Sequence, residues 1–222
     1  MVKSCFRDRA ERAAAFEAVD IYPVISSEFC LGRPVPEVFE AVARGGAKIV
    51  QLREKNRGMK FLYELAVACR PIANAYRMLL LIDDHVDVAI ASGADGVHLG
   101  QDDLPIPVAR SLDPELWLGN STHNLEEARA AKAAGSDYIN IGPIYPTQTK
   151  SVNCGALGIS AIGRIAPEIG LPFTVMGGIK RDRFPELLAA GAKHIAMVTE
   201  ITQAPDVEAR VRELHALFGR NL

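Results

Sequence analysis

The chain has 222 residues and a formal net charge of −2, with 49% hydrophobic and 23% charged residues. This length and composition are those of an ordinary globular protein, and they exclude disordered and fibrous classes. Because the chain carries no excess of basic residues, we expect neither nucleic acid nor a membrane surface as a partner. No apolar run approaches the roughly 20 residues that a membrane-spanning helix needs. Any anionic ligand must therefore be held by a few well-placed residues.

The first 20 residues predict a short amphipathic helix ahead of the main domain. They contain no apolar stretch of the kind that a secretion signal requires. The cysteines are far apart in the chain and form no closely spaced pair, which argues against a disulfide framework or a zinc site: Cys5, Cys30, Cys69 and Cys154. We therefore expect a cytoplasmic protein, with an N-terminal helical extension over residues 1–20 and one domain over residues 21–222.

Eight apolar, β-branched runs predict eight strands. They cover residues 21–26, 47–54, 77–84, 96–100, 116–122, 138–143, 172–179 and 194–201. The runs are continuously apolar, which is typical of parallel strands that are buried on both faces.

Helical patterns lie between these strands and after the last one. Four of them end in glycine shortly before the next strand, in RGGAKIV, SGADGVHL, AGSDYINI and AGAKHIAM, as expected where a helix turns back into a parallel strand. Eight such repeats without a break in composition favour one (β/α)8 TIM barrel of the α/β class. An open doubly wound sheet is the alternative, but no GxGxxG motif follows the first strand. In a barrel, function is expected at the carboxyl ends of the strands.

The segment QLREKN at the end of the second strand predicts an anion site. Alternation along the strand points Gln51 and Arg53 to one side, and Lys55 follows at the strand end. A guanidinium fork and an ammonium suit a phosphate or diphosphate. Alternatively, Arg53 pairs with Glu54 and stabilises the barrel mouth.

Paired acids follow the third and fourth strands, as Asp83-Asp84 and Asp102-Asp103. Carboxylates at adjacent strand ends can converge on Mg²⁺, which binds one or two carboxylates together with water and substrate phosphates. In the alternative interpretation Asp84, and Asp102 or Asp103, cap the following helices. Capping accounts for one acid at each strand but does not require two.

Two further loops suit a phosphate group. The segment TQTK offers the hydroxyls of Thr147 and Thr149 beside Lys150, which fits a phosphate ester, a closing lid or an ordinary surface loop. Gly177 and Gly178 follow the seventh strand, where barrels often bind phosphate through backbone N–H groups, and they also fit a tight turn.

Two histidines are weaker candidates. His98 lies inside an apolar strand and is better interpreted as a hydrogen-bonded core residue. His123 either reaches the site or opens the following helix. Together, the cationic segment, the acids and the phosphate-binding loops suggest two phosphorylated small-molecule substrates and metal-assisted loss of a diphosphate.

The set QLREKN, IDD, GADGVHLGQDDLP, STHN, DYINIGPIYPTQTK and GGI, in this order over residues 20–202, resembles the thiamine phosphate synthase family. The resemblance implies that hydroxymethylpyrimidine diphosphate is joined to thiazole phosphate with Mg²⁺, giving thiamine phosphate and diphosphate. It also implies a dissociative mechanism, in which diphosphate leaves before the thiazole nitrogen attacks.

The resemblance also assigns roles to single residues. Asp84 and Asp103 are the expected Mg²⁺ ligands, and the expected catalytic residues are Arg53, Lys55, Ser121 and Lys150. The expected substrate-binding set comprises Gln51, Arg53, Glu54, Lys55, Asp83, Ser121, Thr147, Gln148, Thr149, Lys150, Gly177, Gly178, Val198 and Thr199.

The chain departs from the family pattern in a few places. Asp83 stands where the family usually has Asn, and the segment SVNCGALG lacks an expected proline. Two other hypotheses therefore stay open: a thiazole tautomerase-like relative, and a non-catalytic protein that binds thiamine precursors. The sequence also leaves open whether the protein is a homo-oligomer.

Overall fold

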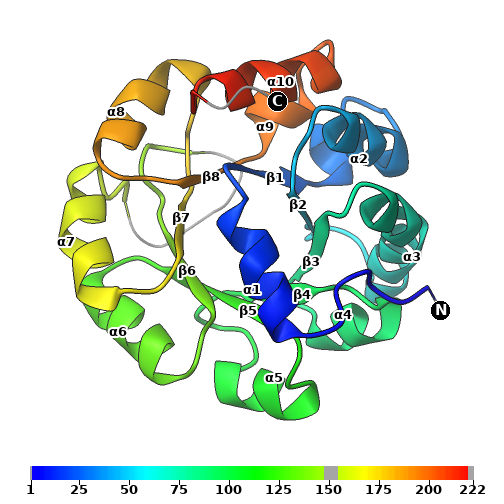
Figure 1. Ribbon diagram of the computed structural model, residues 1–222, viewed down its shortest axis with the longest axis horizontal. Helices are drawn as coiled ribbons and strands as arrows, with labels where there is room; N and C mark the ends of the chain where they lie inside the picture. Colours follow the sequence, from blue (N-terminus) through cyan, green and yellow to red (C-terminus); the bar gives the residue numbers. More distant parts are fainter. Residues whose placement is uncertain (1, 148–154, 220–222) are drawn as a thin grey trace.

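The strands form a closed parallel barrel in chain order from β1 to β8, with β8 pairing back to β1 (Figure 1). The computed structural model describes residues 2–147 and 155–219. Helices surround the sheet, so the predicted (β/α)8 barrel is confirmed.

The eight strands all lie inside the runs predicted from the sequence. They are β1 Ile21–Ile25, β2 Ile49–Leu52, β3 Leu79–Asp83, β4 Gly96–Leu99, β5 Trp117–Thr122, β6 Tyr138–Ile141, β7 Phe173–Val175 and β8 His194–Met197. Nearly every strand residue is buried, as expected for a sheet covered on both faces.

The helices follow the predicted pattern with one difference. They are α1 Arg9–Glu17, α2 Val35–Arg44, α3 Met59–Ala75, α4 Val86–Ser92, α5 Ile106–Leu112, α6 Leu125–Ala133, α7 Ser160–Ile169, α8 Phe184–Ala189, α9 Thr199–Thr202 and α10 Val207–Ala216, with 3-10 turns η1 Ser27–Phe29 and η2 Arg181–Arg183. The prediction of one strand over residues 194–201 was wrong, because β8 stops at Met197 and the short helix α9 follows. The N–H of Thr202 donates to the carbonyl of Val198 at 2.9 Å and closes this turn.

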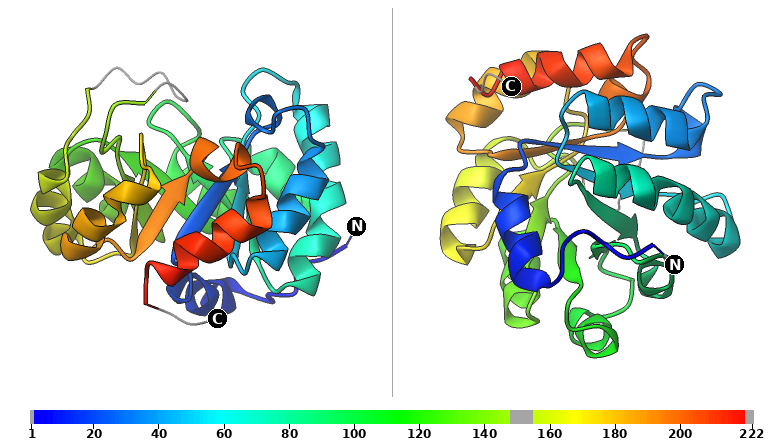
Figure 2. Two further views of the ribbon diagram at one scale, coloured as in Figure 1. Left: turned by 90° about the horizontal axis from the view of Figure 1, so that it is seen from above. Right: turned by 45° about the vertical axis from the view of Figure 1, so that its right-hand side comes forward.

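The interior of the barrel is closed at one end by the N-terminal segment. Phe16 of α1 is fully buried, and its ring centroid lies 4.8 Å from that of Tyr138 and 4.9 Å from that of His194. The left view of Figure 2 shows α1 at the end of the barrel opposite the loops that follow the strands. Residues before β1 therefore form the floor beneath the open mouth. Among the described residues, no helix is long and apolar enough to cross a membrane.

A buried ion pair fastens the outer helices and the N-terminal segment to the sheet. Arg70 of α3 donates to Asp95 at 2.6 Å, and these side chains are 1% and 0% exposed. Asp95 also accepts from the N–H of Leu80 at 2.8 Å and from the hydroxyl of Ser4, while Arg12 Nε lies 3.6 Å away. One carboxylate thus joins β3, α3, α1 and the residues that precede α1.

Candidate active site

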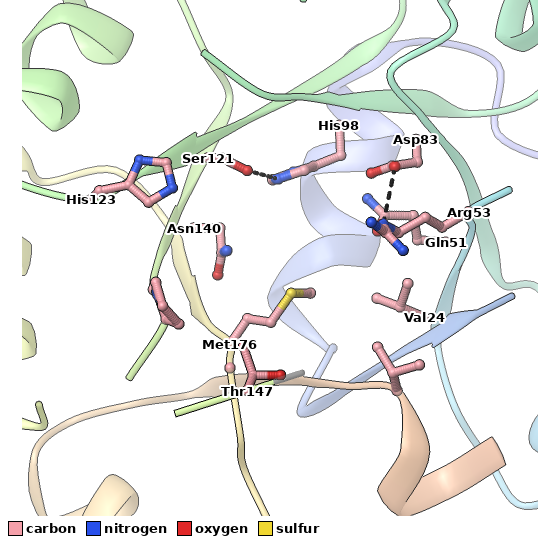
Figure 3. Close-up of a pocket in the computed structure, with 14 residues that line it drawn as sticks. Val24, Gln51, Arg53, Asp83, His98, Ser121, His123, Asn140, Thr147 and Met176 are labelled. Carbon is pink, nitrogen blue, oxygen red and sulfur yellow. Dashed lines mark hydrogen bonds and ion pairs between the residues drawn. The ribbon is translucent and has the colours of Figure 1, made fainter. Parts of the chain in front are cut away.

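A cavity of about 610 Å³, part of it open to solvent, lies at the carboxyl ends of the strands (Figure 3). The structure brings together around it seven residues predicted from the sequence: Gln51, Arg53, Asp83, Ser121, Thr147, Gly177 and Val198.

The bottom of this cavity is a chain of hydrogen-bonded side chains. His98 Nε2 lies 3.0 Å from Ser121 Oγ, and His98 Nδ1 lies 2.9 Å from the hydroxyl of Tyr138, which in turn lies 3.0 Å from that of Tyr22. Burial raises the pKa of both tyrosines, so both stay neutral hydroxyls. His98 is therefore a hydrogen-bonded core residue, as predicted, and it also lines the cavity.

The cationic side chains at the mouth face the carboxylate of Asp83. Arg53 Nε lies 3.4 Å and Lys55 Nζ lies 3.3 Å from Asp83 Oδ2, and Lys55 also contacts Asp84. Partial burial acts to lower the pKa of Lys55, but the two carboxylates outweigh burial and raise it. Lys55 thus stays charged. Glu54 instead accepts from the N–H and the hydroxyl of Ser27, both at 2.7 Å, so the alternative of an Arg53–Glu54 pair is wrong.

Neither pair of acids caps a helix. Helix α4 begins after His85 and α5 begins after Pro105, and neither has a side-chain cap. Asp84 has a φ of 63°, a left-handed conformation incompatible with the extended backbone of an N-cap. The capping interpretation of Asp84, and of Asp102 or Asp103, is therefore wrong, because the chain turns before each helix begins.

Asp84 and Asp103 instead face one another. Burial raises the pKa of Asp103, and the neighbouring carboxylate of Asp84 raises it further. No group of three or more His, Cys, Asp and Glu side chains converges within the described part of the chain. Two facing carboxylates beside an open mouth nevertheless fit Mg²⁺, which completes its shell with water and substrate phosphates.

A second cavity of about 330 Å³ lies between the ends of β7 and β8. It is lined by the turn that carries Gly177 and Gly178 and by Thr199 at the start of α9. It shares a wall with the first cavity, formed by Thr147, Met176, Gly177 and Val198. Ligands in the two cavities would therefore be neighbours.

The two glycines that line the second cavity are required by the turn itself. Gly177 and Gly178 have φ values of 104° and 61°, which side chains rarely adopt. A Cβ on Gly177 would lie 2.6 Å from Pro143 Cα, and a Cβ on Gly178 would overlap the carbonyl of Pro146. The turn is thus pressed against the loop after β6, which sets the shape of the second cavity.

The family model described as thiamine monophosphate synthase matches residues 21–201. The chain belongs to this family. It is 42% identical to the thiamine-phosphate synthase of Pelotomaculum thermopropionicum over 202 residues, which cover 90% of this chain and 93% of that protein. It is also 42% identical to the thiamine-phosphate synthase of Shouchella clausii, with 88% and 94% covered.

A solved structure agrees with these sequence relatives. Thiamine phosphate pyrophosphorylase from Pyrococcus furiosus superposes with a TM-score of 0.85 at 32% identity, covering 93% of this chain and 98% of that one. The resemblance stated from sequence motifs is therefore confirmed for the family and the fold.

Several residues expected from the thiamine monophosphate synthase family do not line the first cavity. Thr199 and Gly178 line only the second cavity, and Lys55, Asp84 and Asp103 lie at the mouth beside Asp83. Glu54 is engaged by the loop after β1. Gln148, Thr149 and Lys150 lie outside the described residues.

Sequence reasoning missed several residues that line the cavities, among them Asn140, Met176 and Lys180. Asn140 could have been found, because a polar side chain in the middle of the apolar run YINI must have a reason to face inward. Met176 carried no such signal. His123 both lines the cavity and contacts Glu127 at 2.8 Å, so both of its suggested roles have support.

Proposed function

We propose that the protein joins hydroxymethylpyrimidine diphosphate to thiazole phosphate, forming thiamine phosphate and releasing diphosphate. The observation that carries this proposal is the shared wall of the two cavities. A reaction between two bound molecules needs adjacent sites, since holding reactants side by side removes much of the entropic barrier. The names of the relatives in the thiamine monophosphate synthase family support the same reaction.

The first cavity suits the aminopyrimidine ring. Gln51 and Ser121 offer hydrogen-bond donors and acceptors to the ring edge, and His98 fixes the Ser121 hydroxyl from below. Arg53 and Lys55 lie where the diphosphate would leave the cavity, at the mouth. Their positive charges stabilise the negative charge that grows on the departing diphosphate.

Asp84 and Asp103 would hold Mg²⁺ at this mouth. When bound, Mg²⁺ neutralises charge on the diphosphate oxygens and so makes diphosphate a better leaving group. Lys55 contacts Asp84 in the described conformation, and it would be released toward the diphosphate when a cation takes its place. Asp83, 8% exposed, holds Arg53 and Lys55 in position from one side.

The second cavity would receive the thiazole phosphate. Thr147, Thr199 and the backbone at Gly178 line it, and Gln148, Thr149 and Lys150 are proposed to complete it from the segment that follows. The carbon–oxygen bond to diphosphate breaks with its electron pair on diphosphate, and the thiazole nitrogen lone pair forms the new carbon–nitrogen bond. The thiazole nitrogen is itself the nucleophile and loses no proton, so neither a nucleophilic side chain nor a general base is needed.

The facing pair of Asp84 and Asp103 favours this reaction over the tautomerase alternative, which needs an acid/base pair and no metal ligands. We further propose a cytoplasmic location, which the unpaired thiols of Cys5, Cys30 and Cys69 support. Whether the enzyme acts as a homo-oligomer stays a prediction.

The test is to incubate both substrates with Mg²⁺ and to detect thiamine phosphate by mass spectrometry. Product that requires both substrates and disappears with a chelator supports the proposal. Absence of product from folded protein, together with tight binding of the pyrimidine diphosphate by calorimetry, would support the non-catalytic alternative instead.

A further inference from the structure

One charged side chain lines the second cavity within the described part of the chain, and it is Lys180. The other lining residues there are apolar, glycine or threonine. A phosphate monoester carries close to two negative charges near neutral pH, so the cavity needs a cation as well as hydrogen-bond donors. We propose that Lys180 determines the specificity of this cavity for the phosphate group of the thiazole substrate. The proposal rests on the proposed function and assigns a residue to its second substrate.

The position of Lys180 is set by both strands that border the cavity. It follows the turn after β7, and its Nζ lies 3.3 Å from the hydroxyl of Thr199 and 3.5 Å from Glu200 Oε2, both beyond the end of β8. The side chain is 53% exposed, so a ligand in the cavity can reach the ammonium. Lys180 therefore spans the cavity from one strand end to the other.

The contacts of Lys180 with Thr199 and Glu200 leave two donors for a ligand, one N–H of the ammonium and the hydroxyl of Thr199. An ammonium has three N–H groups, and Thr199 and Glu200 account for two of them. Because the Thr199 oxygen accepts from Lys180, its own O–H proton is directed to another acceptor. Phosphate oxygens are acceptors that also carry negative charge, so the Lys180 ammonium and the Thr199 hydroxyl together match a phosphate better than the corresponding neutral alcohol.

The carboxylate of Glu200 does not oppose this assignment. A carboxylate at this distance would repel a phosphate, but Glu200 is 10% exposed and lies between Lys180 and Arg210. Two flanking cations offset its charge on both sides. Glu200 then orients the ammonium and leaves the cavity side of Lys180 to the ligand.

A purely structural role makes a different prediction. If Lys180 only tied Glu200 and α9 to the turn after β7, its loss would lower thermal stability and would affect both substrates alike. A phosphate-binding role instead affects one substrate, leaves kcat nearly unchanged, and disappears when the phosphate is removed from that substrate.

The experiment compares Lys180→Met and Lys180→Arg with Lys193→Met. Lys193 is also exposed but lies just before β8, at the opposite end of the barrel. For Lys180→Met we expect the KM for thiazole phosphate to rise about tenfold, equivalent to about 1.4 kcal/mol, while the KM for the pyrimidine diphosphate stays within twofold. Lys180→Arg should recover most of the loss, and Lys193→Met should behave as wild type.

Calorimetry with inorganic phosphate gives a second readout that needs no turnover. Binding should weaken in Lys180→Met by a similar factor, and binding of the thiazole alcohol should not change. An unchanged KM and phosphate affinity would overturn the proposal, as would equal losses for both substrates with a lower melting temperature. If wild type makes no thiamine phosphate, the proposed function fails, but the phosphate titration still tests Lys180.

Discussion

Replacing Arg70 with Met removes one partner of the buried pair with Asp95 and leaves the other inside the fold. Both side chains are almost fully buried, and the 2.6 Å distance between Arg70 and Asp95 is shorter than the 3.6 Å distance between Arg12 and Asp95. Breaking such a pair costs about 3–5 kcal/mol, because the remaining carboxylate is left uncompensated. Arg12 at 3.6 Å moderates the loss, so we expect a value near the lower end, about 3 kcal/mol.

The assay is urea unfolding followed by circular dichroism, with thermal unfolding as a check. For a chain of this size a loss of about 3 kcal/mol corresponds to a fall in melting temperature of about 6–12 °C. The slope of the unfolding free energy against urea concentration should not change, because the variant exposes the same surface when it unfolds. Arg181→Met is the control, since Arg181 is exposed and its loss should leave the midpoint unchanged.

A double-mutant cycle separates the interaction energy of the Arg70–Asp95 pair from the packing contribution of the Arg70 side chain. Asp95→Asn removes the charge but keeps the side-chain volume, so the double variant should be clearly more stable than the sum of the single losses predicts. Additive losses within about 0.5 kcal/mol, or a loss below about 1 kcal/mol for Arg70→Met, would refute the reasoning. Either result would mean that Asp95 finds sufficient partners without Arg70.

The remaining predictions concern the proposed metal ligands and the packing of the barrel. Asp103→Asn should weaken Mg²⁺ binding by about tenfold or more in calorimetric titrations, whereas exposed Asp102→Asn should not, and equal affinities would contradict the assignment. Gly119→Ala should destabilise the fold by more than about 2 kcal/mol in urea unfolding, because its Cβ would overlap the ring of Tyr138. Gly163 lies in helix α7 with open space around it, so Gly163→Ala should instead stabilise the fold by about 0.5–1 kcal/mol. If Gly163→Ala proved less stable than Gly119→Ala, the packing argument would be wrong.

The fold could be predicted because its signals are local. Each strand is an apolar run buried on both faces, and helices such as α4 end at a glycine with a left-handed φ, here Gly93 at 70°. The extension of the last strand through Val198 and Ile201 was wrong because β-branched residues favour strands wherever packing does not decide otherwise. In the structure the backbone turns at Val198, and its carbonyl starts helix α9.

The site was only partly predictable because its remaining features depend on distant contacts. Neighbouring carboxylates at strand ends suggested a metal from sequence alone, but the positive φ of Asp84, which excludes capping, is a property of the folded backbone. Lys180 carries no motif, and only the spacing between β7 and β8 brings it to the cavity. The floor under Ser121 likewise depends on Tyr138 and Tyr22, which are 116 positions apart in the chain.

The closure of the barrel by its own first helix has a consequence for how the chain folds as it is synthesised. Phe16 packs against His194, and Asp20 at the start of the barrel contacts His215 at 2.7 Å across 195 positions. These two partners are thus synthesised long after the segment that they contact. Until then Phe16 of α1 lacks part of its cover, and contacts this distant in sequence form late because long loops must close first. While the later strands are being synthesised, Phe16 of α1 therefore stays partly exposed, and α1 is where a chaperone that shields nascent chains would be expected to bind.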